Sequence, residues 1–165
     1  MILTLSIIKF LFPFLLLGLF FCLYKKEYGF MKRFYCKTVT SFNARNLYCM
    51  ALSAVLIFLN WCCFETDHNY AVACAALMTI PFMFNSVADH VLHLLHESLV
   101  LLVTTLILAM VCYTIPYLNS VFHVLFTVSV ASQFYPSERV LAMKSLNKYK
   151  TNFIARLIIA IKSHH

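Results

Sequence analysis

The stretch NLYCMALSAVLIFLNWCCF, residues 46–64, decides the fold, because it contains no charged side chain from its first residue to its last. A helix needs roughly 20 apolar residues to cross about 30 Å of hydrocarbon. The whole chain shares this character: 62% of its 165 residues are apolar, 12% are charged, and the mean hydropathy is +0.84. Soluble domains are about half apolar and about a quarter charged. The sequence therefore predicts an all-α integral membrane protein.

Four further stretches with few charges predict membrane-spanning helices on either side of this one. The five expected spans are residues 2–24, 46–64, 70–87, 99–115 and 117–135. Lys9 and Pro13 interrupt the first of these stretches, Pro81 interrupts the third, and Pro116 separates the last two. Such breaks are tolerated in spanning helices, although they can shorten them.

The basic residues predict how these helices are oriented. Most of the thirteen Lys and Arg residues lie in two segments, 25–45 and 139–162. Because cytoplasmic loops are enriched in Lys and Arg, both segments are expected inside the cell. Four expected spans separate them, and an even number returns the chain to the same side. The N-terminus and the short acidic loop at 65–69 are then outside, and the C-terminus is inside.

The first apolar stretch is expected to remain in the protein as a helix. No small-x-small cleavage signal follows it, although a cleaved or lipidated leader is the alternative. The chain also has no Asn-x-Ser/Thr sequence, which is compatible with a bacterial membrane. We therefore expect a multi-pass protein of the cell inner (cytoplasmic) membrane.

The segment DHVLHLLHES, residues 89–98, carries the most informative polar pattern. On a helix its ionisable residues fall within about 120° of the circumference, opposite the leucines. Imidazoles and carboxylates on adjacent turns are suitable ligands for zinc, iron, nickel or manganese. The pattern makes Asp89, His93, His96 and Glu97 a candidate site for a divalent transition metal.

Two other interpretations of the same segment remain open. The three histidines titrate near neutrality, so this face is also a candidate pH sensor. A helix that lies in the membrane interface needs a polar stripe toward the headgroups, and that requirement alone produces the same pattern. The sequence does not decide between a metal site, a proton site and an interfacial helix.

No catalytic motif is present. The sequence HESLV at residues 96–100 begins like the HExxH motif of zinc proteases, but Val100 stands where the second histidine belongs. The chain has neither GxSxG nor a Walker A motif, and it contains only two glycines. Its seven cysteines include no CxxC pair. We therefore expect a protein that is not an enzyme and that requires no cofactor.

The last residues, 137–165, are expected to form a basic amphipathic helix beside the transmembrane domain, residues 1–136. Apolar residues recur there every three to four positions, and Lys144, Lys148 and Lys162 lie on the opposite side. Such a helix binds a bilayer surface with anionic headgroups. The formal net charge of +7 is also compatible with nucleic-acid binding. Because the charge flanks the spans, where insertion requires it, no nucleic-acid partner is expected.

These features predict a small polytopic protein that acts by helix contacts with another membrane component or with a second copy of itself. Immunity and exclusion proteins, which block a pore or an entry route, resemble it in size and layout only. The alternative is a metal-ion or proton transporter or sensor that uses the polar face at Asp89–Glu97.

Overall fold

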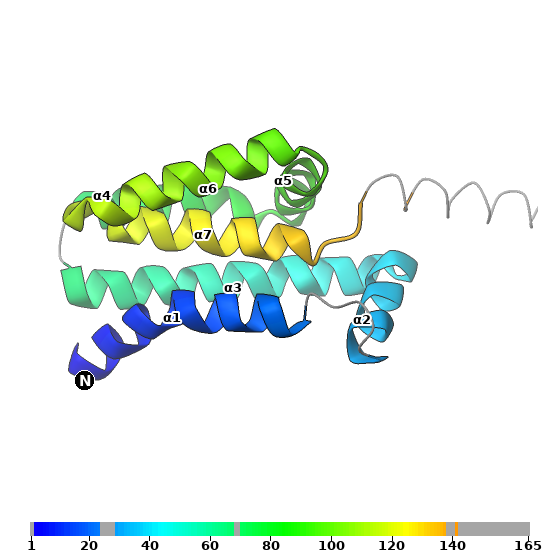
Figure 1. Ribbon diagram of the computed structural model, residues 1–165, viewed down its shortest axis with the longest axis horizontal. Helices are drawn as coiled ribbons and strands as arrows, with labels where there is room; N and C mark the ends of the chain where they lie inside the picture. The colour runs from blue at the N-terminus through cyan, green and yellow to red at the C-terminus, as the bar shows by residue number, and fades with distance from the viewer. Residues whose placement is uncertain (1, 24–28, 68–69, 138–140, 142–165) are drawn as a thin grey trace, which may run out of the picture.

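The computed structural model describes residues 2–23, 29–67, 70–137 and 141 of the chain (Figure 1). Every regular element in these ranges is helical, so the predicted all-α class is confirmed. In chain order the helices are α1 (Ile2–Leu23), α2 (Gly29–Thr40), α3 (Phe42–Asp67), α4 (Tyr70–Thr79), the 3₁₀ turn η1 (Ile80–Met83), α5 (Asn85–Glu97), α6 (Leu99–Thr114), the 3₁₀ turn η2 (Pro116–Leu118) and α7 (Asn119–Gln133).

The helix lengths do not support five full-length spans. Within the described ranges, α3 is the single helix that is long and apolar enough to cross a bilayer by itself. The segment from α4 through α5 qualifies as a second span only if its two bent halves are counted together. α6 and the Leu3–Leu19 part of α1 are apolar but shorter. Length and composition therefore support one or two spans.

The expected third span, residues 70–87, is wrong as a single helix. α4 ends at Thr79, and Pro81 lies in η1, where its ring removes a backbone donor that a continuing α-helix would use. Phe84 then adopts an extended backbone, with φ −91° and ψ 111°. The two halves meet at 102°, so the polar segment after Phe84 becomes the separate helix α5.

The bundle has two distinct ends (Figure 1). α1, α3, α6 and α7 run along the long axis, and α7 lies between α3 and α6. α2 and α5 lie at the end where α3 begins and α7 finishes, which we call the α2–α5 end. α3 finishes at the opposite end, which we call the Asp67 end. Residues 29–40, expected as part of a basic connection, thus form the helix α2.

The expected helix at 137–165 lies outside the described residues, apart from Ser137 and Leu141. Lys144, Lys148 and Lys162, the residues expected to contact lipid headgroups, lie there as well. Their role at a membrane surface remains a prediction.

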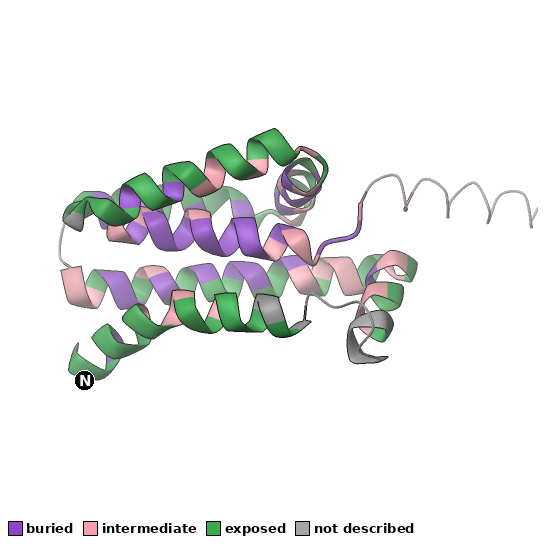
Figure 2. Ribbon diagram, in the orientation of Figure 1, coloured by how far each residue is buried: buried purple, intermediate pink, exposed green. Residues whose placement is uncertain are grey.

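α7 forms the centre of the bundle, and it is rich in small polar residues. It packs against α1, α3, α4, α5 and α6, and Figure 2 shows it buried along most of its length. Ser120, Thr127, Ser129 and Ser132 are all at most 3% exposed. Three of these hydroxyls donate to carbonyls of α7 itself, at 2.6 to 2.7 Å. Small side chains that satisfy their own hydroxyls let neighbouring helices approach closely, as in membrane bundles.

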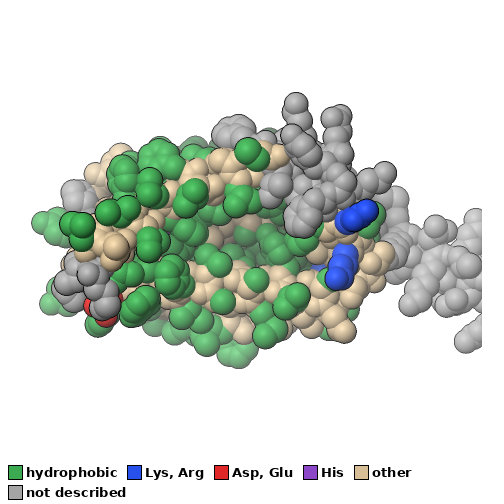
Figure 3. All heavy atoms as spheres, turned by 90° about the horizontal axis from the view of Figure 1, so that it is seen from below, with side chains coloured by type: hydrophobic (Ala, Val, Ile, Leu, Met, Phe, Trp, Pro, Cys, Tyr) green, Lys and Arg blue, Asp and Glu red, His purple; other side chains and the backbone are tan. Residues whose placement is uncertain are grey.

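The outer surface of the bundle is also apolar. Val100 and Ile107 on α6 are 77% and 59% exposed, and Tyr70 at the start of α4 is 95% exposed. Figure 3 shows hydrophobic side chains spread over most of the face that it views. Monomeric soluble proteins rarely expose apolar patches larger than a few hundred Å². The surface of the bundle is therefore far more apolar than that of a soluble bundle, while its interior is packed largely with apolar side chains as well.

Candidate functional site

α5 lies across the α2–α5 end and turns part of its polar face into the bundle. The helix starts after the extended Phe84 and ends at Glu97. The hydroxyl of the next residue, Ser98, accepts from the Leu101 backbone N–H and thereby caps α6. Packing against α3, α6 and α7 buries Ala88, Leu92, His93 and Leu95. Apolar side chains thus fix the helix in place, and His93 is buried with them.

Asp89 is the centre of a cluster that joins three parts of the chain. The Tyr135 hydroxyl, just beyond α7, donates to Asp89 Oδ1. His93 Nε2 lies 3.5 Å from the same oxygen, one helical turn further along α5. The His93 ring also meets the Tyr135 ring edge-on, with 4.9 Å between centroids. Cys49 Sγ of α3 lies 3.8 Å from the Tyr135 hydroxyl.

The environment of this cluster is mixed. Tyr135 is 1% exposed, whereas the side chain of Asp89 is 42% exposed. The carboxylate thus reaches the surface, and its buried partners lie behind it. Because the Tyr135 hydroxyl donates to Asp89, the Cys49 thiol can donate to the Tyr135 oxygen and extend the chain of hydrogen bonds into α3.

His96 makes a different contact. Its Nδ1 lies 2.9 Å from the backbone carbonyl of Ser132, in the last turn of α7. A carbonyl only accepts, so this nitrogen carries the proton. The last carbonyls of a helix have no partner within the helix. The Tyr135 backbone N–H donates to this one at 3.2 Å, and His96 is a further donor to it. This bond attaches α5 to α7 at a second point.

The four expected metal ligands do not form one group. Asp89 and His93 lie together, His96 is directed to the Ser132 carbonyl, and Glu97 is exposed. Within the described part of the chain, no three His, Cys, Asp or Glu residues are close enough together to hold a metal ion. The four residues belong to one helix, α5, but only Asp89 and His93 lie close together.

A second polar contact lies near the Asp67 end and joins α1 to α3. Lys9 Nζ lies 2.5 Å from Asp67 Oδ1 and donates to Thr66 Oγ1 at 3.2 Å. The side chains of Lys9 and Asp67 are only 13% and 19% exposed. Lys9 also lines a hollow of about 400 Å³ between α1, α6 and α7, together with the buried His123 and the half-buried Asn119.

The sequence identified these residues singly but not as partners. Lys9 stood out as a charge within an apolar stretch, and Asp67 was assigned to an exposed loop. Tyr135 is the last residue of the stretch expected as the fifth span. A lone charge in a spanning helix is a signal that a partner exists, and the acidic loop offered candidates for it.

Comparison of the chain with protein-family models, with curated proteins and with solved structures finds no match in any of the three.

Proposed function

We propose that the chain is a small multi-pass protein of the inner membrane of a bacterium, with its N-terminus outside and its C-terminus in the cytoplasm. In this topology α1, α3, α4 with η1, α6 and α7 cross the bilayer in alternating directions. α2 and α5 lie at the cytoplasmic surface. The observation that carries the proposal is the apolar outer surface of the bundle, because large hydrophobic side chains face outward there as well as filling the interior.

The charges at the two ends support this orientation. Arg33, Lys37 and Arg45 belong to α2 and the start of α3, at the α2–α5 end. Glu65 and Asp67 lie at the other end of α3, and Figure 3 shows basic and acidic side chains at opposite ends of the molecule. An excess of basic residues marks the cytoplasmic side of a membrane protein.

We further propose that the protein acts without catalysis, by binding another membrane component or a second copy of itself through α6. This helix lies at the edge of the bundle, and it packs on α5, α7 and η2. Only Ala109 and Cys112 of α6 are buried, whereas Val100, Ile107 and Met110 are more than half exposed. An apolar helix face at the edge of a bundle is available to a neighbouring transmembrane helix.

The polar face of α5 has a structural part in this proposal. The Asp89–Tyr135 and His96–Ser132 bonds attach α5 to the end of α7, so both groups act as anchors. A metal-ion or proton transporter or sensor is the alternative function that the sequence suggested. It would require His96 and Glu97 to move toward Asp89 and His93.

The topology can be tested with reporter fusions along the chain. A fluorescent protein fused after residue 41, 98 or 165 is expected to fluoresce, because it remains in the cytoplasm. Alkaline phosphatase fused after residue 69 or 116 is expected to be active, because it is exported. Phosphatase that is inactive after residue 69 would show that α3 does not cross the membrane, and it would overturn the proposal.

The binding function can be tested by photo-crosslinking in living cells. A photoreactive phenylalanine at Ile107, which is 59% exposed, is expected to give one discrete adduct of higher mass. The matched control is Ala109, two residues away and fully buried, where the same group should give none. An adduct of twice the mass of the chain identifies a homo-oligomer. Equal labelling at both positions, or a diffuse smear from Ile107, would contradict a specific contact.

A further inference from the structure

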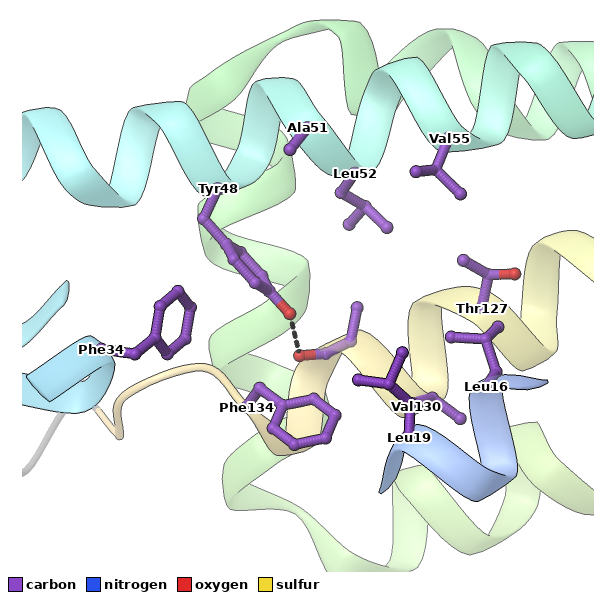
Figure 4. Close-up of a pocket in the computed structure, with 11 residues that line it drawn as sticks. Leu16, Leu19, Phe34, Tyr48, Ala51, Leu52, Val55, Thr127, Val130 and Phe134 are labelled. Carbon is purple, nitrogen blue, oxygen red and sulfur yellow. Dashed lines mark hydrogen bonds between the residues drawn. The ribbon is translucent and has the colours of Figure 1, made fainter. Parts of the chain in front are cut away.

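An apolar groove opens between α1, α3 and α7 near the α2–α5 end (Figure 4). It has a volume of about 320 Å³. Figure 4 shows Leu52 and Val55 of α3 facing Val130 of α7, with Leu16 and Leu19 of α1 alongside. The wall of the groove is therefore made mainly by aliphatic side chains of these helices, together with the aromatic rings of Phe34, Tyr48 and Phe134.

The polar groups in the wall of this groove already have partners. The Tyr48 hydroxyl donates to the Ala131 carbonyl at 2.8 Å, as the dashed line in Figure 4 marks. The Thr127 hydroxyl donates to the His123 carbonyl of its own helix. Because these hydroxyls are engaged, a ligand in the groove would meet apolar atoms, which suits a hydrocarbon chain.

A second hollow continues this groove toward α2. The two share Phe34, Tyr48 and Ala51 in their walls, so they are adjacent at these residues. The second hollow has a volume of about 480 Å³, and Lys37 and Asn43 contribute to its lining. Lys37 lies in the last turn of α2 and is exposed. The combined site thus changes from purely apolar to polar and cationic along its length.

We propose that this combined site binds one anionic phospholipid, with an acyl chain between α1, α3 and α7 and the headgroup beside Lys37. The distribution of polarity along the site matches such a molecule. The apolar part of the site lies within the bundle, and its cation, Lys37, lies at the basic α2–α5 end. A neutral lipid would fill the groove equally well but would not pair with Lys37. This inference rests on the proposed membrane location.

The test uses the full chain purified in mild detergent and titrated with phosphatidylglycerol or phosphatidylcholine. Native mass spectrometry measures the occupancy by one lipid and gives an apparent dissociation constant. Phosphatidylglycerol is expected to bind at least about fivefold more tightly than phosphatidylcholine, because one cation near an anionic headgroup contributes a free energy of about that size. Lys37→Gln should remove this preference, and Lys37→Arg should keep it. Arg33→Gln, an exposed cation of the same helix outside the lining, is the matched control.

A second pair of variants tests the groove itself. Val55→Trp fills the groove and is expected to weaken the binding of both lipids by about tenfold or more. Val103→Trp, at an exposed valine of α6, should leave both constants within about twofold. If Val55→Trp does not fold, Ala51→Phe blocks the junction of the two hollows from an exposed position.

Equal binding of the two lipids, or equal effects of the Val55 and Val103 variants, would overturn the proposal. Conversion of a dimer to a monomer by Val55→Trp, with lipid binding unchanged, would show that a second copy occupies the groove instead. Reporter fusions that confirm the topology while lipid selectivity is absent would remove this inference alone and leave the membrane proposal intact.

Discussion

Replacing Asp67 with leucine is expected to lower the free energy of unfolding by about 3 kcal/mol, because the change leaves the Lys9 ammonium largely buried without its partner. Lys9→Met should lower the free energy of unfolding by a similar amount, because it leaves the Asp67 carboxylate largely buried without its partner. The double variant should recover to within about 1 kcal/mol of the natural chain, since a pair of apolar residues can replace a buried ion pair at little cost.

Unfolding of these variants by a denaturing detergent in mild-detergent micelles can be followed through Trp61, the single tryptophan of the chain. Glu65→Gln is the matched control, because it removes a neighbouring acid of α3 and should change the free energy by less than about 0.5 kcal/mol. A double variant as unstable as the sum of the two single variants would show that Lys9 and Asp67 act independently.

Replacing Leu56 with alanine is expected to cost about 3 kcal/mol, because Leu56 is fully buried among residues of α3, α4, α5 and α7. The adjacent Ile57 is 48% exposed, and Ile57→Ala should cost less than about 1 kcal/mol. In a bilayer the Ile57 side chain contacts lipid hydrocarbon in both the folded and the unfolded bundle, so shortening it changes the free energy of unfolding little. The cost at Leu56 comes from the cavity that remains among packed side chains.

The same unfolding measurement compares these two variants. Leu56→Met keeps most of the side-chain volume and should cost less than about 1.5 kcal/mol. Equal losses at Leu56 and Ile57 would mean that burial in the bundle does not determine stability.

Hydrophobic composition predicted the helical class and the approximate place of most helices. The stretches at 2–24, 46–64, 99–115 and 117–135 correspond to α1, α3, α6 and α7 within a few residues. This agreement is expected, because a continuous apolar stretch has to satisfy its backbone groups internally in a membrane. Fewer helices are full-length than the five expected spans, because hydropathy does not register where a helix bends or ends early.

The contacts of the candidate site could not be predicted in the same way. The period of a helix places Asp89, His93 and His96 on one face, but it says nothing of what that face meets. Tyr135 lies 46 residues from Asp89 along the chain, and Asp67 lies 58 residues from Lys9. Such pairs depend on how the helices are arranged, and the 102° bend before α5 determines that arrangement at Asp89.

The shortness of α6 and α7 has a consequence for the surrounding lipid. α6 has 16 residues and α7 has 15, so they are about 24 Å and about 22 Å long. A bilayer core of about 30 Å exceeds both lengths. In the proposed topology the lipid must compress around this side of the bundle, and the elastic cost grows with every ångström of mismatch. Membrane thickness would then influence where in the cell the protein accumulates, and thin or deformable regions would be favoured.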